Sequence, residues 1–203
     1  MKENSEPTKE KRSFLKKKYI LWGIVVFFIL ILFSAYVFHK IASNLFFPEE
    51  YRAIVKKYSA EYEIDPLLVS AVIYTESHYD PSVVSPKGAI GLMQILPSTA
   101  GGIRKKEKLH PVTKEELKDP ELNIKTGCRY LHYLLNKYDS DISTALAAYN
   151  AGFANVTRWK NQSNELEFDK VLASQGFKET KDYVYNVRKV HDLLIKLNLI
   201  MPL

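Results

Sequence analysis

Residues 65–100 read DPLLVSAVIYTESHYDPSVVSPKGAIGLMQILPSTA, and the fold is decided here. The stretch opens with Asp65 and Pro66, a pair typical of a helix start. The aspartate side chain caps free backbone N–H groups, and proline fits the first helical position. We therefore expect a helix from Leu67 to Ser77.

Glu76 lies near the end of this predicted helix. It continues an apolar stripe formed by Val69, Val72 and Ile73, which are spaced three or four residues apart. A carboxyl in that position is partly desolvated, and desolvation raises its pKa toward the range that a general acid needs near neutral pH. Taken alone, the pattern favours a simpler interpretation, in which Glu76 marks the solvent boundary of the helix.

The motifs around Glu76 favour the catalytic interpretation over the solvent-boundary one. ESHYDP at 76–81, GAIGLMQILPSTA at 88–100, AYNAG at 148–152 and ETKDYV at 179–184 occur in this order. Together they strongly resemble the soluble lytic transglycosylase family, whose members have a lysozyme-like fold related to goose-type lysozyme. The resemblance implies a mainly α, lysozyme-like helical domain.

The resemblance also assigns roles to single residues. It implies that Glu76 is the catalytic acid and base, that Met93 and Gln94 line the sugar groove, and that Tyr149 lies near Glu76. It further suggests that the remaining site residues shape the site or bind substrate: Ser85, Asn150, Glu179 and Tyr183.

A reaction with one carboxylate follows from the same resemblance. Glu76 would protonate the glycosidic oxygen between N-acetylmuramic acid and N-acetylglucosamine, and then deprotonate the muramic C6 hydroxyl, giving a 1,6-anhydro sugar. Most glycosidases use two carboxylates. Asp80 and Glu179 are the candidates for a second one, but Asp80 before Pro81 is typical of a turn. A hydrolytic muramidase or chitin-type glycosidase on the same fold stays open, as does a non-catalytic glycan-binding scaffold in the membrane.

The N-terminal region predicts a membrane anchor. Residues 19–38 carry no charge, and three lysines precede them within a basic tail at 1–18. A helix of this length spans a bilayer, and the positive-inside rule places the tail in the cytoplasm. We expect a transmembrane helix at 19–41 and an extracytoplasmic domain at 42–203. A cleaved signal peptide is the alternative, although no convincing cleavage site follows the run.

Further helices are expected in the domain. Asp119 and Pro120 open one, residues 141–148 form a shorter one, and residues 180–199 form the last. The Lys- and Glu-rich segment 101–118 is typical of a solvated connection.

Composition narrows the remaining function classes. Of the net charge of +6, most lies in the N-terminal tail, because residues 19–203 hold 22 basic and 20 acidic side chains. A nucleic-acid partner is therefore not expected. The expected partners are peptidoglycan, which the resemblance implies, and the membrane, which the N-terminal region predicts. The five histidines lack metal-ligand spacing, so neither a metal nor another cofactor is expected. Cys128 is the single cysteine, so no intramolecular disulfide can form. We expect its thiol to be buried and inert.

Overall fold

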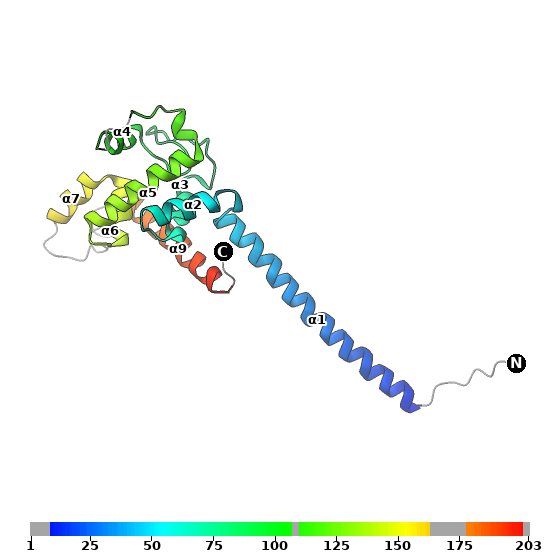
Figure 1. Cartoon of the computed structure of the whole chain (residues 1–203). Helices are drawn as coiled ribbons and strands as arrows, with labels where there is room; N and C mark the ends of the chain where they lie inside the picture. Colours follow the sequence, from blue (N-terminus) through cyan, green and yellow to red (C-terminus); the bar gives the residue numbers. More distant parts are fainter. Residues whose placement is uncertain (1–8, 107–109, 163–177, 201–203) are drawn as a thin grey trace. The chain divides into compact units, whose positions relative to one another are not determined.

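The computed structural model of the chain describes residues 9–106, 110–162 and 178–200. Within these ranges the chain is helical and forms no strand (Figure 1), which confirms the predicted mainly α class. The chain divides into two compact units, Met1–Ala42 and Ser43–Leu203. The described helices are α1 (Lys9–Phe46), α2 (Glu49–Glu61), α3 (Pro66–Ser77), α4 (Pro97–Lys106), the 3-10 helix η1 (Glu116–Lys118), α5 (Pro120–Lys137), α6 (Ile142–Ala151), α7 (Phe153–Gln162) and α9 (Lys178–Ile200).

Three helices begin at the aspartates that the sequence marked. The Asp65 carboxylate accepts a hydrogen bond from the backbone N–H of Leu67, and Asp119 accepts one from Leu122. Asp141 caps α6 in the same way. Each side chain satisfies an N–H group that the helix itself leaves unpaired, so the predicted starts of α3, α5 and α6 are confirmed.

The segment 101–118 differs from the expected solvated connection. Its first part, residues 101–106, belongs to α4, and residues 116–118 form η1 with Leu117 fully buried. Pro97 occupies the first position of α4, where its missing N–H costs nothing. Within the described part of this segment, residues 101–106 and 116–118 are therefore helical, and residues 110–115 form the non-helical connection.

The core of the second unit is built around α3. Almost every side chain from Leu67 to Ile73 is buried, because α3 packs between α2 and α9. A second layer places α6 against α5, α7 and α9. Cys128, on α5, is fully buried in this core, and burial raises the pKa of its thiol to about 12. The thiol is thus protonated at neutral pH, as expected of an inert cysteine.

Helix α1 is apolar over most of its length. Its segment Lys17–Phe46 has 30 residues, an 18-residue window of this segment has a mean hydropathy of 2.7, and its apolar side chains are exposed within unit Met1–Ala42. By length and composition this segment is able to cross a membrane. The span predicted at 19–41 falls inside it.

The last turn of α1 belongs to the second unit. The backbone carbonyl of Phe46 accepts hydrogen bonds from the hydroxyls of Ser70, at 3.3 Å, and Tyr79, at 3.1 Å. The next residue, Phe47, is fully buried. The apolar helix therefore leads into the folded domain without an intervening linker.

Candidate active site

Glu76 lies in the last turn of α3. The helix ends two residues later at His78, which adopts a left-handed conformation with φ of 51°. The Glu76 side chain is half-buried, and burial raises the pKa of its carboxyl from 4.5 to about 7. The apolar stripe thus has the electrostatic effect that the sequence predicted, and Glu76 retains its proton up to neutral pH.

Tyr183, from α9, faces this carboxyl. The tyrosine is buried, and its hydroxyl stabilises the ionised form of Glu76, which opposes the effect of burial on the Glu76 pKa. The contact falls short of a standard hydrogen bond, and the hydroxyl has no other partner within the described residues. A buried hydroxyl without a partner is costly, so this one is available to a ligand or to an approaching carboxylate.

Tyr149, from α6, approaches Glu76 from another side. Burial raises the pKa of Tyr149 well above its usual value, and the Glu76 charge adds to the shift. Its hydroxyl donates to the backbone carbonyl of Met93 at 2.8 Å. The Tyr149 hydroxyl proton is therefore used in this hydrogen bond, and toward any other neighbour the hydroxyl oxygen can act only as an acceptor.

Met93 does not present its side chain to a groove. The residue is fully buried, and its side chain packs against Gly127 of α5. This differs from the expectation that Met93 lines the sugar groove. Its part in the site is a backbone one, because its carbonyl fixes the Tyr149 hydroxyl.

Asn123 is a component that the sequence analysis missed. This fully buried side chain of α5 accepts a hydrogen bond from the Met93 N–H at 2.7 Å. Its amide also donates to the carbonyls of Ile90, at 2.8 Å, and Leu117, at 2.7 Å. One side chain thus holds the 90–93 loop against α5. One signal in the sequence could have identified Asn123. It is a polar residue on the apolar face of a predicted helix, beside Ile124 and four residues before Gly127.

Gln94 lies in the same loop with a positive φ of 47°. Its side-chain amide donates to the carbonyls of Val83, at 3.0 Å, and Gly91, at 2.9 Å. Both amide hydrogens are therefore used inside the loop. The amide oxygen is the group that Gln94 can offer to a ligand.

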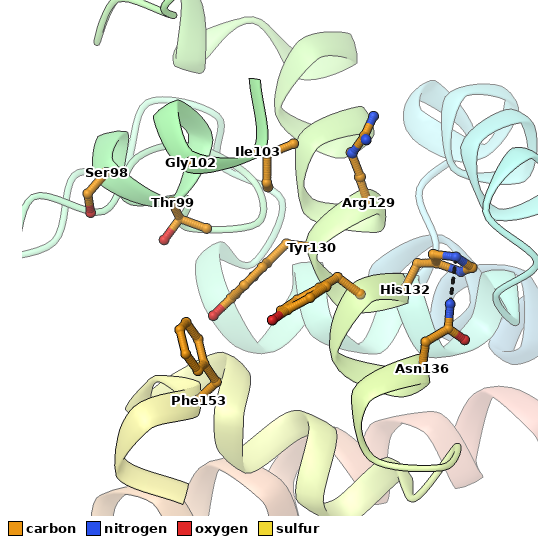
Figure 2. A pocket seen from close by; sticks show the side chains of 10 residues that line it. Ser98, Thr99, Gly102, Ile103, Arg129, Tyr130, His132, Asn136 and Phe153 are labelled. Carbon is orange, nitrogen blue, oxygen red and sulfur yellow. Dashed lines mark hydrogen bonds between the residues drawn. The ribbon is translucent and has the colours of Figure 1, made fainter. Parts of the chain in front are cut away.

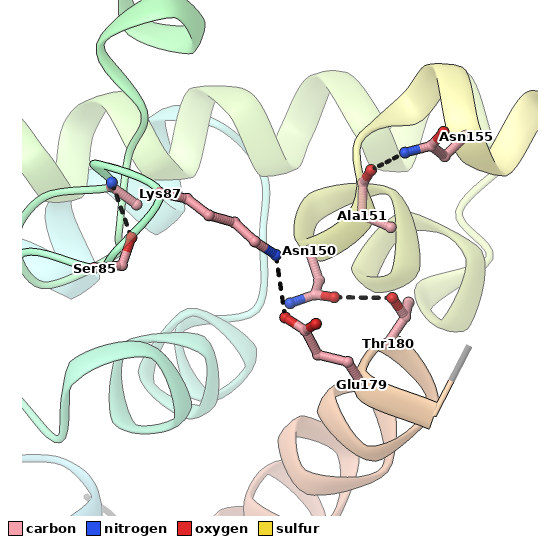
Figure 3. A network of polar contacts seen from close by, with 8 residues as sticks. Ser85, Lys87, Asn150, Ala151, Asn155, Glu179 and Thr180 are labelled. Atoms are coloured by element: carbon pink, nitrogen blue, oxygen red, sulfur yellow. Dashed lines mark hydrogen bonds and ion pairs between the residues drawn. The ribbon is translucent and has the colours of Figure 1, made fainter. Parts of the chain in front are cut away.

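Ser85, Asn150 and Glu179 each make polar contacts with neighbouring residues (Figure 3). Ser85 closes its own loop, since its hydroxyl accepts from the Ala89 N–H at 3.0 Å. The Asn150 side-chain oxygen accepts from the hydroxyl of Thr180 at 3.0 Å. Glu179 forms an exposed ion pair of 3.3 Å with Lys87, which joins α9 to the 85–89 loop.

A cleft of about 580 Å³ brings half of the predicted site residues together, and Glu76 is not among its lining residues. Gln94, Tyr149, Asn150 and Glu179 all line it. A second hollow, also about 580 Å³, lies between α4 and α5, with the rings of Tyr130 and Phe153 in its wall (Figure 2). The two hollows share Thr99 and Tyr130 and are therefore neighbours on the domain.

Among the residues that the structure describes, Glu76 has no carboxylate partner. Asp80 accepts hydrogen bonds from the backbone N–H of Ser82, at 2.8 Å, and from its hydroxyl, at 2.6 Å, which makes it a turn cap as expected. Glu179 is paired with Lys87, and neither acid contributes to the raised pKa of Glu76. Over the described ranges, His, Cys, Asp and Glu side chains form no cluster suited to a metal ion.

Several known proteins are similar to this chain in sequence. Residues 53–172 match the family model described as Transglycosylase SLT domain. The chain is 36% identical over 143 residues to the soluble lytic murein transglycosylase of Escherichia coli K12, an alignment covering 70% of this chain and 22% of the relative. It is 36% identical over 118 residues to the membrane-bound lytic murein transglycosylase C of Photorhabdus laumondii, covering 54% of this chain and 33% of the relative.

A solved structure shares the fold. An inactive mutant of the lytic transglycosylase Slt from Pseudomonas aeruginosa superposes with a TM-score of 0.69 and 29% identity, covering 77% of this chain and 26% of that one. In each comparison, this chain therefore spans no more than a third of the protein it matches.

Proposed function

Because the chain belongs to the SLT-domain transglycosylase family, we propose that it is a peptidoglycan lytic transglycosylase with Glu76 as its catalytic residue. The bond cleaved is the β-1,4 link between N-acetylmuramic acid and N-acetylglucosamine, and the product carries a 1,6-anhydro-muramic end. The observation that carries the proposal is a desolvated carboxyl, with a pKa raised to about 7, whose charge acts on Tyr149 in the wall of the cleft.

A lone carboxyl of this kind suits a two-step proton transfer. Neutral Glu76 first donates its proton to the glycosidic oxygen, and the bond from that oxygen to C1 of the muramic sugar breaks. The resulting Glu76 carboxylate then takes the proton of the C6 hydroxyl, while the C6 oxygen forms a bond to C1. The enzyme ends in its starting protonation state, and no water is consumed.

Tyr183 and Tyr149 serve different stages of this cycle. The unpartnered Tyr183 hydroxyl donates to Glu76 once its proton has left, which stabilises the carboxylate between the two steps. The Tyr149 oxygen faces the positive charge that develops at C1, because its own proton is held by Met93. Gln94, Asn150 and Glu179 line the cleft and contact the sugars, while Met93 and Ser85 hold the surrounding loops.

Digestion of purified peptidoglycan tests the proposal. The wild-type chain should release muropeptides lighter by one water than those from a muramidase. Glu76→Gln should lower cleavage by about 10²–10⁴-fold, while Glu63→Gln, which changes an exposed carboxylate before α3, should cleave normally. Near-normal cleavage by a folded Glu76→Gln protein would refute the mechanism. Products with an added water would keep the acid but identify a hydrolase.

We also infer that α1 anchors the domain in the cell membrane as a single span with the basic tail in the cytoplasm. Support comes from the 30-residue apolar segment and from the membrane-bound relative. External protease on protoplasts should remove the domain after Pro48 and leave the residues before Tyr19 intact. Protection of the domain would contradict this orientation.

A further inference from the structure

A groove of about 940 Å³ lies between the end of α3 and one face of α9, and the proposed reaction does not use it. Four cationic side chains of α9 line it, spaced so that they share one helix face, and Asp192 is the one acid among the lining residues. The four cations are Lys181, Arg188, Lys189 and Lys196.

This concentration of charge is local. Residues 19–203 are nearly neutral overall, with 22 basic and 20 acidic side chains. Arg188 is held in place by a hydrogen bond of 2.8 Å to the Ser143 hydroxyl. The three lysines form no ion pair within the described residues, so their charge is available to an anionic partner.

The groove also has an aromatic wall. The rings of Phe46 and Tyr74 lie 4.5 Å apart, and Tyr185 of α9 is 64% exposed. Aromatic rings beside lysines suit a membrane interface, where rings lie at headgroup level and lysine chains extend toward phosphates.

We propose that this basic groove binds the phosphates of anionic phospholipids in the membrane that holds α1. The inference rests on the anchoring proposed above. Phe46 is both the last residue of the apolar segment and part of the groove wall. With the span at 19–41, Phe46 follows its end by five residues of the same helix, a rise of about 8 Å, which is the thickness of the headgroup layer that holds the phosphates. Basic residues at this depth attract an anionic leaflet.

Headgroup contact is measurable on the full chain in lipid nanodiscs. A fluorophore is attached through Tyr185→Cys, with Lys125→Cys on the exposed face of α5 as the matched control position. The buried Cys128, whose pKa is about 12, stays unlabelled. Phosphatidylglycerol discs containing a lipid spin-labelled at its headgroup should quench the label at 185 at least about twofold more than the label at 125, and high salt should reduce the difference.

Charge variants then identify the groove. Replacing Lys181, Lys189 and Lys196 together by Gln should abolish the excess quenching, as should phosphatidylcholine discs. The same replacement at Lys105, Lys114 and Lys137, three exposed lysines on other elements, should leave it unchanged. Equal quenching at both positions, or an equal effect of both triple variants, would overturn the proposal.

Two further readouts separate this inference from its alternatives. Flotation with vesicles comes first: a chain that does not float contradicts the anchoring itself, whereas a chain that floats without excess quenching contradicts only the groove. Titrating inorganic phosphate into the detergent-solubilised labelled chain should leave the fluorescence unchanged. A saturable response there, without quenching by lipid, would assign the groove to a soluble phosphate ligand instead.

Discussion

The hydroxyl of Tyr149 donates a hydrogen bond of 2.8 Å to the backbone carbonyl of Met93. The N–H of Met93 in turn donates to Asn123 at 2.7 Å. A continuous series of hydrogen bonds therefore runs from α5 through the 90–93 loop to α6. It fixes the Tyr149 oxygen beside Glu76 without using a flexible side chain of the loop.

Tyr149→Phe should lower kcat by about tenfold or more with a smaller change in KM, because it removes an oxygen proposed to face the charge in the transition state. It also leaves the buried Met93 carbonyl unpaired, which costs about 1–3 kcal/mol of stability. Steady-state kinetics and urea unfolding measure the two effects. Tyr138→Phe is the control, since it removes a tyrosine hydrogen bond to the Phe153 carbonyl elsewhere; equal kinetic losses in both variants would remove Tyr149 from the mechanism.

The rate should depend on the protonation of Glu76. Its pKa of about 7 means that kcat/KM should fall above neutral pH, by about tenfold per pH unit, as the acid loses its proton. Initial rates on soluble glycan fragments between pH 5 and 9 provide the profile. A flat profile across neutral pH would show that Glu76 does not act as the acid.

Glu76 should also make stability depend on pH. Its folded-state pKa of about 7 lies above the usual 4.5, so the native state favours the protonated form. Folding therefore bears no cost from this group below pH 4.5; the cost grows between pH 4.5 and about 7 and stays constant above that. After allowance for partial exposure, Glu76→Gln should be more stable than wild type by about 2–3 kcal/mol at pH 8 and about equal at pH 4. Urea unfolding at both pH values checks this; a gain of the same size at pH 4 would exclude the ionisation as its source.

Two glycine variants separate packing from helix propensity. A Cβ at Gly127 would meet the Met93 sulfur at 2.2 Å, whereas a Cβ at Gly101 meets nothing within 4 Å. Gly127→Ala should therefore destabilise the protein by about 1–3 kcal/mol through overpacking, and should lower activity by displacing Met93. Gly101→Ala should be neutral or stabilising by up to about 1 kcal/mol. Thermal unfolding gives the melting temperature of both variants. Similar shifts in the two melting temperatures would mean that Gly127 and Met93 are not closely packed.

The helix starts could be predicted because they depend on residues that are close together in the sequence. Asp65, Asp119 and Asp141 cap helices within two or three residues of themselves, so their effect is readable without the tertiary structure. The burial of Glu76 was likewise visible as a spacing on one helix. Residues 101–106 were misjudged because their charges describe the exposed face of α4 and carry no information on its backbone.

The part of the site that escaped prediction depends on contacts distant in sequence. Asn123 reaches Ile90 and Met93 across about thirty positions, and no local pattern identifies those partners. For the same reason, the burial of Met93 was not visible in a motif that places it beside the half-buried Gln94. Roles could be assigned by resemblance, whereas the direction in which each side chain points required the structure.

The direct junction at Phe46 sets the reach of the enzyme. When α1 spans a membrane, the absence of a linker means that the catalytic centre cannot lie farther from the bilayer than one domain diameter, about 40 Å for a unit of this size. The proposed enzyme, anchored in this way, would reach only the layer of cell wall next to the membrane. Strands beyond that depth are inaccessible to it, however well they fit the cleft.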